Sequence, residues 1–329
     1  MSKIQDALKE RILVLDGAMG TMLQRNQFKE ADFRGERFKD FPYPLQGNND
    51  LLSITQPEAV KTVHRLYFQA GADIVETNTF SATTIGMADY HLQDLVYELN
   101  YQSAKIAREV ADEFTDRPRF VAGSIGPTNR TASMSPDVND PGFRAVTFDE
   151  LRMAYKQQVE ALIDGGCDVL LVETIFDTLN AKAALFAIEE VKETRNLDIP
   201  VMVSGTITDA SGRTLSGQTV EAFLISIQHI PLLSVGFNCA LGADQLKPYL
   251  KRLAHNTTLN ISAHPNAGLP NAFGQYDQTP QEMQALIKEY LQDNLVNIIG
   301  GCCGTTPEHI KAIAEVAKQF KPRQILETI

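Results

Sequence analysis

The sequence predicts an α/β fold, a single (β/α)8 barrel, from three observations. Short apolar runs rich in branched residues recur along the 329 residues, each followed by a Gly/Asn/Thr/Pro-rich turn and then a helical stretch. These runs do not alternate apolar with polar residues, which is typical of a parallel sheet covered on both faces. Eight such units occur without a linker-like stretch between them, so we expect one domain over residues 1–329. A doubly wound sheet is the alternative, because it is also built from repeated β-then-α units.

The expected strands follow one another in chain order. They fall at residues 12–15, 74–76, 120–123, 169–173, 201–205, 233–237, 260–263 and 297–299. Amphipathic helices are expected between them, for example at residues 58–70, 148–164 and 243–254. The last helix has clear boundary signals, because Thr306 can cap it and Pro307 occupies its first turn. The first unit is too long, and its polar segment 25–52 is predicted to be an insertion over the barrel mouth.

Composition excludes several classes of function. A chain with 43% hydrophobic residues can bury a large core. A net charge of −11 and a pI near 5.1 argue against nucleic acid and anionic membranes as partners. The N-terminus is charged and has no apolar core, so we expect no signal peptide and a cytoplasmic location. Four cysteines do not make a disulfide scaffold in so long a chain, and we interpret them as candidate metal or catalytic thiols.

Three cysteines follow expected strands and therefore converge at one end of the barrel. Cys302 and Cys303 are adjacent in a glycine-rich run after the eighth strand, and the glycines allow backbone angles that turn both thiols toward one point. Cys239 follows the sixth strand. Three thiolates without a fourth protein ligand describe a zinc site with an open position, and a vicinal disulfide is the rival interpretation. Cys167 is expected to be a small buried residue, and His264 a polar wall group or a histidine with a satisfied hydrogen bond rather than a ligand.

The ligand set predicts the kind of reaction. Three thiolates leave zinc a weak Lewis acid toward water, so a zinc-dependent hydrolase is the less natural interpretation. A substrate thiol that enters the open position loses its proton there and stays nucleophilic. The predicted chemistry is S-alkylation of a thiol.

Acidic residues at strand ends predict the rest of the substrate. Asp16 and Glu173 follow the first and fourth strands, where they could hold an ammonium group, and Glu76 has a similar place after the second. Their structural alternative is helix capping or pairing with a lysine. Backbone N–H groups of the glycine-bearing turns at residues 17–20 and 123–126 could bind a carboxylate. A thiol, an ammonium and a carboxylate together describe a thiol amino acid.

Motifs at these strand ends resemble the homocysteine S-methyltransferase family, most closely its branch of homocysteine-binding modules from cobalamin-dependent methionine synthases. The motifs lie at residues 15–22, 31–38, 76–80, 126–133, 205–214, 238–242, 263–268 and 300–306. They run from the first expected strand to the last, so the resemblance covers essentially the whole chain.

The resemblance implies a role for each site residue. The zinc ligands, catalytic through the metal, would be Cys239, Cys302 and Cys303. Asp16 and Glu173 match the acids that hold the amino group of homocysteine, and the turn beginning at Gly17 resembles part of the carboxylate-binding backbone. The full set of expected substrate contacts is Asp16, Gly17, Ala18, Asn78, Ser124 and Glu173.

The resemblance also implies a methyl donor from outside this chain. The methyl group would come from methylcobalamin, recharged by methyltetrahydrofolate, and the product would be methionine. The string from Asp89 to Asp94 lacks the glycine of the Asp-x-His-x-x-Gly signature of cobalamin modules, and no folate barrel follows the eighth strand. We therefore expect cobalamin- and methyltetrahydrofolate-binding modules in cis or in trans. Two alternatives stay open: betaine or S-methylmethionine as donor, and a homocysteine- and zinc-binding module that is inactive without partner domains.

Overall fold

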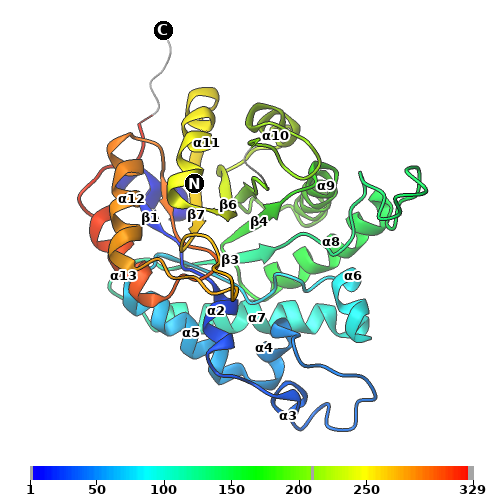
Figure 1. The fold of residues 1–329 in the computed structure, drawn as a ribbon. Helices are drawn as coiled ribbons and strands as arrows, with labels where there is room; N and C mark the ends of the chain where they lie inside the picture. The colour runs from blue at the N-terminus through cyan, green and yellow to red at the C-terminus, as the bar shows by residue number, and fades with distance from the viewer. Residues whose placement is uncertain (1–2, 209–210, 325–329) are drawn as a thin grey trace.

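The computed structural model describes residues 3–208 and 211–324, and it contains eight parallel strands with helices outside them (Figure 1). The strands are β1 Leu13–Val14, β2 Ile74–Glu76, β3 Phe120–Ile125, β4 Val169–Ile175, β5 Val201–Gly205, β6 Ser234–Gly242, β7 Asn260–Asn266 and β8 Ile298–Ile299. Their order is β1-β8-β7-β6-β5-β4-β3-β2. A parallel bridge between Leu15 and Ile74, with the Asp16 N–H donating to the Ile74 carbonyl at 2.9 Å, joins β1 to β2. The predicted (β/α)8 barrel is confirmed.

Helices surround the strands in a ring (Figure 1). They are α1 Lys3–Glu10, α2 Met19–Gln24, α3 Glu30–Arg34, α4 Leu52–Thr55, α5 Pro57–Ala70, α6 Thr84–Met87, α7 Val96–Asp112, α8 Phe148–Asp164, α9 Thr178–Arg195, α10 Val220–Ile227, α11 Ala243–Asn256, α12 Pro280–Gln292 and α13 Pro307–Ala317, with short 3-10 turns η1 Asn49–Leu51, η2 Ala88–Tyr90 and η3 Gln93–Leu95. Their starts follow from local sequence: Thr147 and Glu150 form a capping box at α8, and Thr279 and Glu282 form one at α12. Within the described ranges, no helix combines the length and apolar character needed to cross a membrane.

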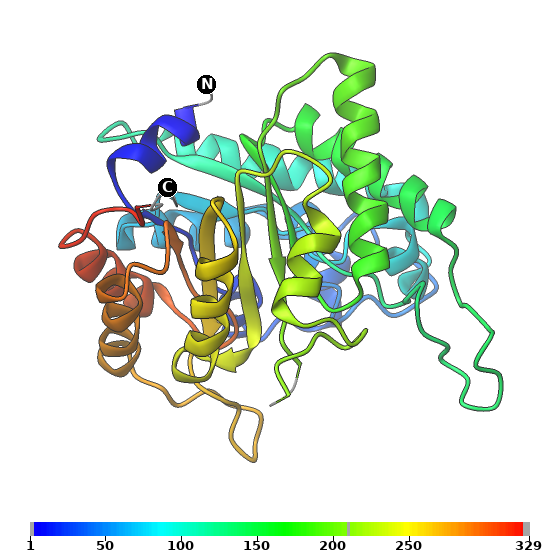
Figure 2. The ribbon, with the colours of Figure 1, turned by 90° about the horizontal axis from the view of Figure 1, so that it is seen from above.

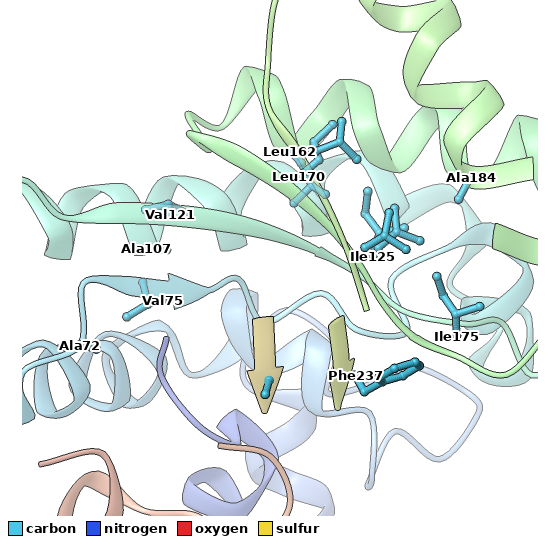
Figure 3. Close-up of a cluster of buried hydrophobic side chains, with 14 of the residues drawn as sticks. Ala72, Val75, Ala107, Val121, Ile125, Leu162, Leu170, Ile175, Ala184 and Phe237 are labelled. Carbon is cyan, nitrogen blue, oxygen red and sulfur yellow. The ribbon is translucent and has the colours of Figure 1, made fainter. Parts of the chain in front are cut away.

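Alternate residues of each strand enter two separate apolar layers. On β3, Phe120 and Ala122 belong to the cluster inside the barrel, whereas Val121 and Ile125 pack between the strands and the outer helices. Figure 3 shows part of this outer layer, with Val121, Ile125 and Leu170 among the side chains drawn. Because both faces of each strand are buried, the strands read as continuous apolar runs in the sequence.

Two strands extend beyond their expected ends through bulges. β6 was expected to end at residue 237 but continues to Gly242, with a register shift against β7 after Asn238. β4 continues to Ile175, with a shift against β5 after Val172. A bulge bends its strand and redirects the side chains beside it. Both irregularities occur where the strands carry candidate site residues.

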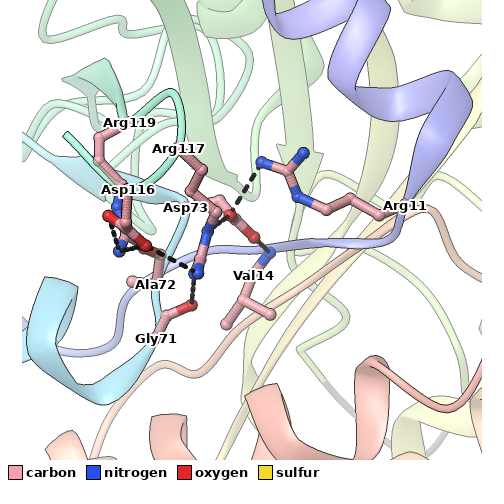
Figure 4. A network of polar contacts seen from close by, with 8 residues as sticks. All are labelled: Arg11, Val14, Gly71, Ala72, Asp73, Asp116, Arg117 and Arg119. Atoms are coloured by element: carbon pink, nitrogen blue, oxygen red, sulfur yellow. Dashed lines mark hydrogen bonds and ion pairs between the residues drawn. The ribbon is translucent and has the colours of Figure 1, made fainter. Parts of the chain in front are cut away.

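The two ends of the barrel differ in what they carry. Figure 2 shows α1 at one end and the long loops after β3 and β7 at the other. At the α1 end, Asp73 accepts hydrogen bonds from the Val14 N–H at 2.9 Å and from Arg117 Nε at 2.8 Å, and it pairs with Arg11 at 3.2 Å (Figure 4). This network ties β1 to the segments that precede β2 and β3, so we assign it to stability.

Candidate metal and substrate site

A cavity of about 860 Å³ lies at the carboxyl ends of the strands. Predicted site residues on its wall are Ala18, Asn78, Ser124, Glu173, Cys239, Cys302 and Cys303. Asp16 and Gly17 do not line the cavity, and Asp16 is buried. Residues 47–50 of the insertion form part of the wall. A second cavity of about 830 Å³ beside α1 contains none of the predicted site residues.

The three predicted cysteines come together as one cluster. The sulfur atoms of Cys239, Cys302 and Cys303 all lie within 4.8 Å of one another, and the Sγ atoms of Cys239 and Cys303 are 3.8 Å apart. Two tetrahedral ligands with Zn–S bonds of about 2.3 Å are separated by about 3.8 Å, so the spacing fits zinc. Cys167 is not part of the cluster; it is partly rather than fully buried and packs on the core beside Gly123.

The glycines around the cysteine pair act mainly through close packing. An added Cβ at Gly301 would lie 2.4 Å from Thr305 Cγ2, and one at Gly300 would lie 2.8 Å from Leu15 Cβ. Of the glycines at 300, 301 and 304, only Gly304 has a positive φ, of 80°. The expectation that glycines supply unusual backbone angles therefore holds at one of the three positions. At the other two, contact with neighbouring chain segments leaves no room for a side chain.

The direction of the third candidate ligand, Cys239, is fixed instead by a strained backbone at residues that are not glycine. Cys239 and Ala240 have φ values of 59° and 56°, in the left-handed region that costs a non-glycine residue about 1–2 kcal/mol. Both lie in the bulged part of β6. Strain of this kind persists only where the surroundings fix it, and it is commonly found at functional sites.

Asn238 links this bulge to its neighbours. Its Oδ1 accepts from the Thr174 N–H at 3.1 Å and from Ser204 Oγ at 2.6 Å. Its Nδ2 donates to Thr174 Oγ1 at 2.8 Å and lies 3.9 Å from Cys302 Sγ. One buried amide thus connects the ends of β4, β5, β6 and the loop after β8. The sequence motif contained Asn238, but only the three-dimensional contacts reveal this role.

Tyr276 is a site residue that no sequence motif marks. It lines the cavity and packs on Gly304, where an added Cβ would lie 2.3 Å from Tyr276 Cβ and 2.4 Å from the ring atom Cγ. Hydrogen bonds from the thiols of Cys239 and Cys302 lower the pKa of Cys303 to about 3, and the Tyr276 hydroxyl acts in the same direction. Burial, followed by the charge on Cys303, raises the pKa of Tyr276 to about 12.

Two buried carboxyl groups, Asp16 and Glu173, and the half-buried Glu76 form the acidic part of the site. Burial raises the pKa of Glu173 to about 7, and the charge on Cys303 adds to the effect, although Ser124 Oγ donates to Glu173 Oε1 at 2.5 Å. Burial and the charge of Glu173 raise the pKa of Asp16, which accepts the Glu76 N–H at 3.2 Å. Burial and its two acidic neighbours raise the pKa of Glu76. Such a cluster favours a cationic ligand, because each carboxylate is stabilised by a nearby positive charge.

The remaining predicted residues differ in whether they reach the cavity. Ala18 lines the cavity next to α2, and its N–H is only weakly engaged, at 3.4 Å from Thr305 Oγ1. Asn78 also lines the cavity, but its Nδ2 donates to the Asn49 carbonyl at 2.8 Å and so supports the insertion. His264 is buried on β7 outside the cysteine cluster. Asp209 and Ala210 of the motif at residues 205–214 lie outside the described residues.

Comparisons with known proteins show what the whole chain is similar to. The chain matches the homocysteine S-methyltransferase family over residues 13–317. The metallated form of the homocysteine methyltransferase MmuM from Escherichia coli has a similar structure, with 25% identity, a TM-score of 0.71, and coverage of 93% of this chain and 96% of that chain. Its apo form matches at 23% identity and a TM-score of 0.66, over 94% of this chain and 97% of that one, which supports the fold alone. The chain belongs to the homocysteine S-methyltransferase family.

Proposed function

We propose that this chain binds homocysteine at a zinc ion held by Cys239, Cys302 and Cys303, and that the homocysteine sulfur accepts a methyl group to give methionine. The observation that carries the proposal is the cluster of three cysteine sulfurs on the wall of the cavity, with a spacing that fits tetrahedral zinc. Zinc bound there would supply the charge that removes the proton from a substrate thiol at neutral pH. A cluster of reduced thiols also favours a cytoplasmic location.

The acids beside the cysteines would hold the amino group. An ammonium has three N–H donors, and Glu173, Asp16 and Glu76 are mutually close carboxyl groups. Ser124 keeps Glu173 in place by donating to one of its oxygens. The backbone of Gly17 and Ala18, next to the N-terminus of α2, would take the substrate carboxylate, because the first N–H groups of a helix have no partner within it.

The methyl donor in this proposal is methylcobalamin carried by another domain or protein and recharged by methyltetrahydrofolate. The motif at residues 205–214 supports this choice through its resemblance to the cobalamin-dependent branch of the family. The volume of the cavity, about 860 Å³, also supports it, because pockets of this size accept ligands much larger than one amino acid. Betaine and S-methylmethionine are the alternative donors.

Assays with each donor test the proposal. Zinc-loaded protein and homocysteine are incubated with methylcobalamin, betaine or S-methylmethionine, and methionine is measured. We expect turnover with methylcobalamin. Turnover with betaine alone would reject the proposed donor, and homocysteine binding without turnover on any donor would support a binding module that needs partner domains.

The metal ligands are tested by a matched pair of substitutions. Cys303→Ala should lose zinc and homocysteine binding while the barrel stays folded, because a metal at a barrel mouth need not hold the barrel together. Cys167→Ala should keep both, since Cys167 lies outside the cluster. Stoichiometric zinc and normal homocysteine binding in Cys303→Ala would refute the site.

A further inference from the structure

The insertion brings a further buried carboxyl group to the cavity. Asp50 belongs to the short turn η1, lines the cavity and is only 5% exposed. The proposed function assigns the amino group of homocysteine to Asp16, Glu76 and Glu173. Asp50 has no part in that task. A buried carboxyl group needs partners, so the surroundings of Asp50 indicate what it binds.

The protein itself bonds to only one oxygen of this carboxyl group. Asp50 Oδ2 accepts the Ser81 N–H at 3.0 Å. Among the residues that the structure describes, none donates a hydrogen bond to Oδ1 and no cationic side chain pairs with the group. Burial raises the pKa of Asp50 to about 7, although the Ser81 N–H acts in the opposite direction. A ligand in the cavity that donates an N–H would supply the partner that Oδ1 lacks.

A hydroxyl group is available on the same wall of the cavity. Tyr90 also lines the cavity, and within the described ranges no residue forms a hydrogen bond with its hydroxyl. This hydroxyl lies beside Gly47, where an added Cβ would be 3.5 Å from it, and Gly47 precedes Asp50 by three residues. Burial, followed by the charges of Asp50 and Asp89, raises the pKa of Tyr90. One acceptor and one donor therefore line the cavity from neighbouring positions.

Hydrogen bonds hold this wall in place without using the two available groups. The Asn78 side chain donates to the Asn49 carbonyl at 2.8 Å and so ties the turn to the loop after β2. Asn48 Oδ1 accepts the Leu51 N–H at 3.2 Å and caps η1. The position of Asp50 is thus fixed before a ligand arrives, which lowers the entropic cost of binding.

We propose that Asp50 and Tyr90 form a subsite for a primary carboxamide of the methyl donor, in which the Asp50 carboxylate accepts the amide N–H and the Tyr90 hydroxyl donates to the amide oxygen. The inference rests on the proposed function and adds a specificity site to it. The corrin ring of cobalamin carries primary carboxamides on flexible arms, and such an arm can reach a carboxyl group that is almost buried. Betaine has no N–H group, and its carboxylate would be repelled by Asp50. The subsite therefore favours cobalamin over betaine.

Equilibrium dialysis with cyanocobalamin tests the subsite apart from turnover, because this corrin has the same carboxamides and no methyl group on cobalt. The full chain is compared with the variants Asp50→Asn and Tyr90→Phe. Asparagine keeps the shape of the side chain, but when its oxygen accepts the Ser81 N–H it presents an N–H donor in place of the free oxygen. The matched control is Asp89→Asn, because Asp89 is exposed beside Tyr90, accepts from Asn129 at 2.7 Å and does not line the cavity.

The expected losses differ between the variants. Asp50→Asn should raise the dissociation constant of cyanocobalamin roughly 10- to 100-fold, the range for a hydrogen bond to a charged group. Tyr90→Phe should raise it roughly three- to tenfold, because a neutral hydrogen bond is lost. Asp89→Asn should bind cyanocobalamin as wild type does, and all three variants should keep the zinc content and homocysteine affinity of wild type. In turnover, the effect of Asp50→Asn should appear in the KM for methylcobalamin rather than in kcat.

Three outcomes would overturn the inference. The first is cyanocobalamin binding that is absent in wild type or equal in wild type and Asp50→Asn. The second is loss of zinc or homocysteine in Asp50→Asn, which would show that Asp50 only supports the wall. The third is a raised KM for S-methylmethionine with unchanged cyanocobalamin affinity, which would assign the subsite to an ammonium group. Wild-type protein that binds cyanocobalamin but forms no methionine from methylcobalamin would instead reject the donor of the proposed function, so the two failures are distinguishable.

Discussion

Replacing Glu173 by glutamine should weaken homocysteine binding and stabilise the fold at the same time. The substitution keeps the shape of the side chain and its contact with Ser124 Oγ, and removes only the charge. Hydrogen bonds to charged groups contribute about 1.5–3 kcal/mol, which corresponds to a roughly 10- to 100-fold increase in the homocysteine dissociation constant. Zinc affinity should stay close to that of wild type, because Glu173 is not in the sulfur cluster.

The stability change has the opposite sign. The pKa of Glu173 rises from an ordinary value of 4.5 to about 7, so folding favours the neutral carboxyl group. The stability contributed by the neutral form is present below pH 4.5 and is lost as the pH rises through 7. At higher pH the buried charge costs on the order of 3 kcal/mol, and glutamine removes this cost.

Two measurements at several pH values check both effects. Titration calorimetry of zinc-loaded protein should show wild-type affinity for homocysteine falling as the pH drops below about 7, with a smaller change in Glu173→Gln. Urea unfolding should show the variant to be more stable than wild type above that pH. Glu113→Gln is the control, because Glu113 pairs with Arg65 on the surface. A variant that binds homocysteine normally, or that is less stable at high pH, would refute the reasoning.

Two further predictions concern the frame around the site. Gly301→Ala should lose about 1–3 kcal/mol of stability together with zinc affinity, because its Cβ would lie 2.4 Å from Thr305 Cγ2. The control Gly142→Ala, in an exposed loop, should change neither quantity. Urea unfolding and zinc titration measure the two effects. Asp73→Asn should lower the free energy of unfolding by about 1–3 kcal/mol, because it weakens the pairing with Arg11 and Arg117. Its zinc affinity should stay at the wild-type value, and a reduced affinity would show that the two ends of the barrel are coupled.

The barrel was predictable because its strands are buried on both faces and punctuated by turn residues. The cysteine cluster was predictable for a related reason, since parallel strands bring their carboxyl ends to one edge. Other features lacked such a signal. His64 on α5 and His309 on α13 are both buried, because helix-to-helix packing decides which face of a helix is covered. Tyr276 lies in a non-periodic loop, and only the hairpin bridge brings it to Cys303.

The limit of sequence reasoning coincides with the functional part of the barrel for a physical reason. Strand periodicity predicts side-chain direction only where the ladder is regular, and β4 and β6 lose their register at Thr174 and Cys239. Both residues have left-handed φ values, of 54° and 59°, and Asn238 bonds to the backbone N–H and the hydroxyl of Thr174. If β4 and β6 were regular to their ends, the side-chain directions of Glu173 and Cys239 would follow from the alternation of faces along each strand. The bulges instead re-aim the chain at the mouth of the barrel, and the regular sheet below them supplies the stability that offsets the strain.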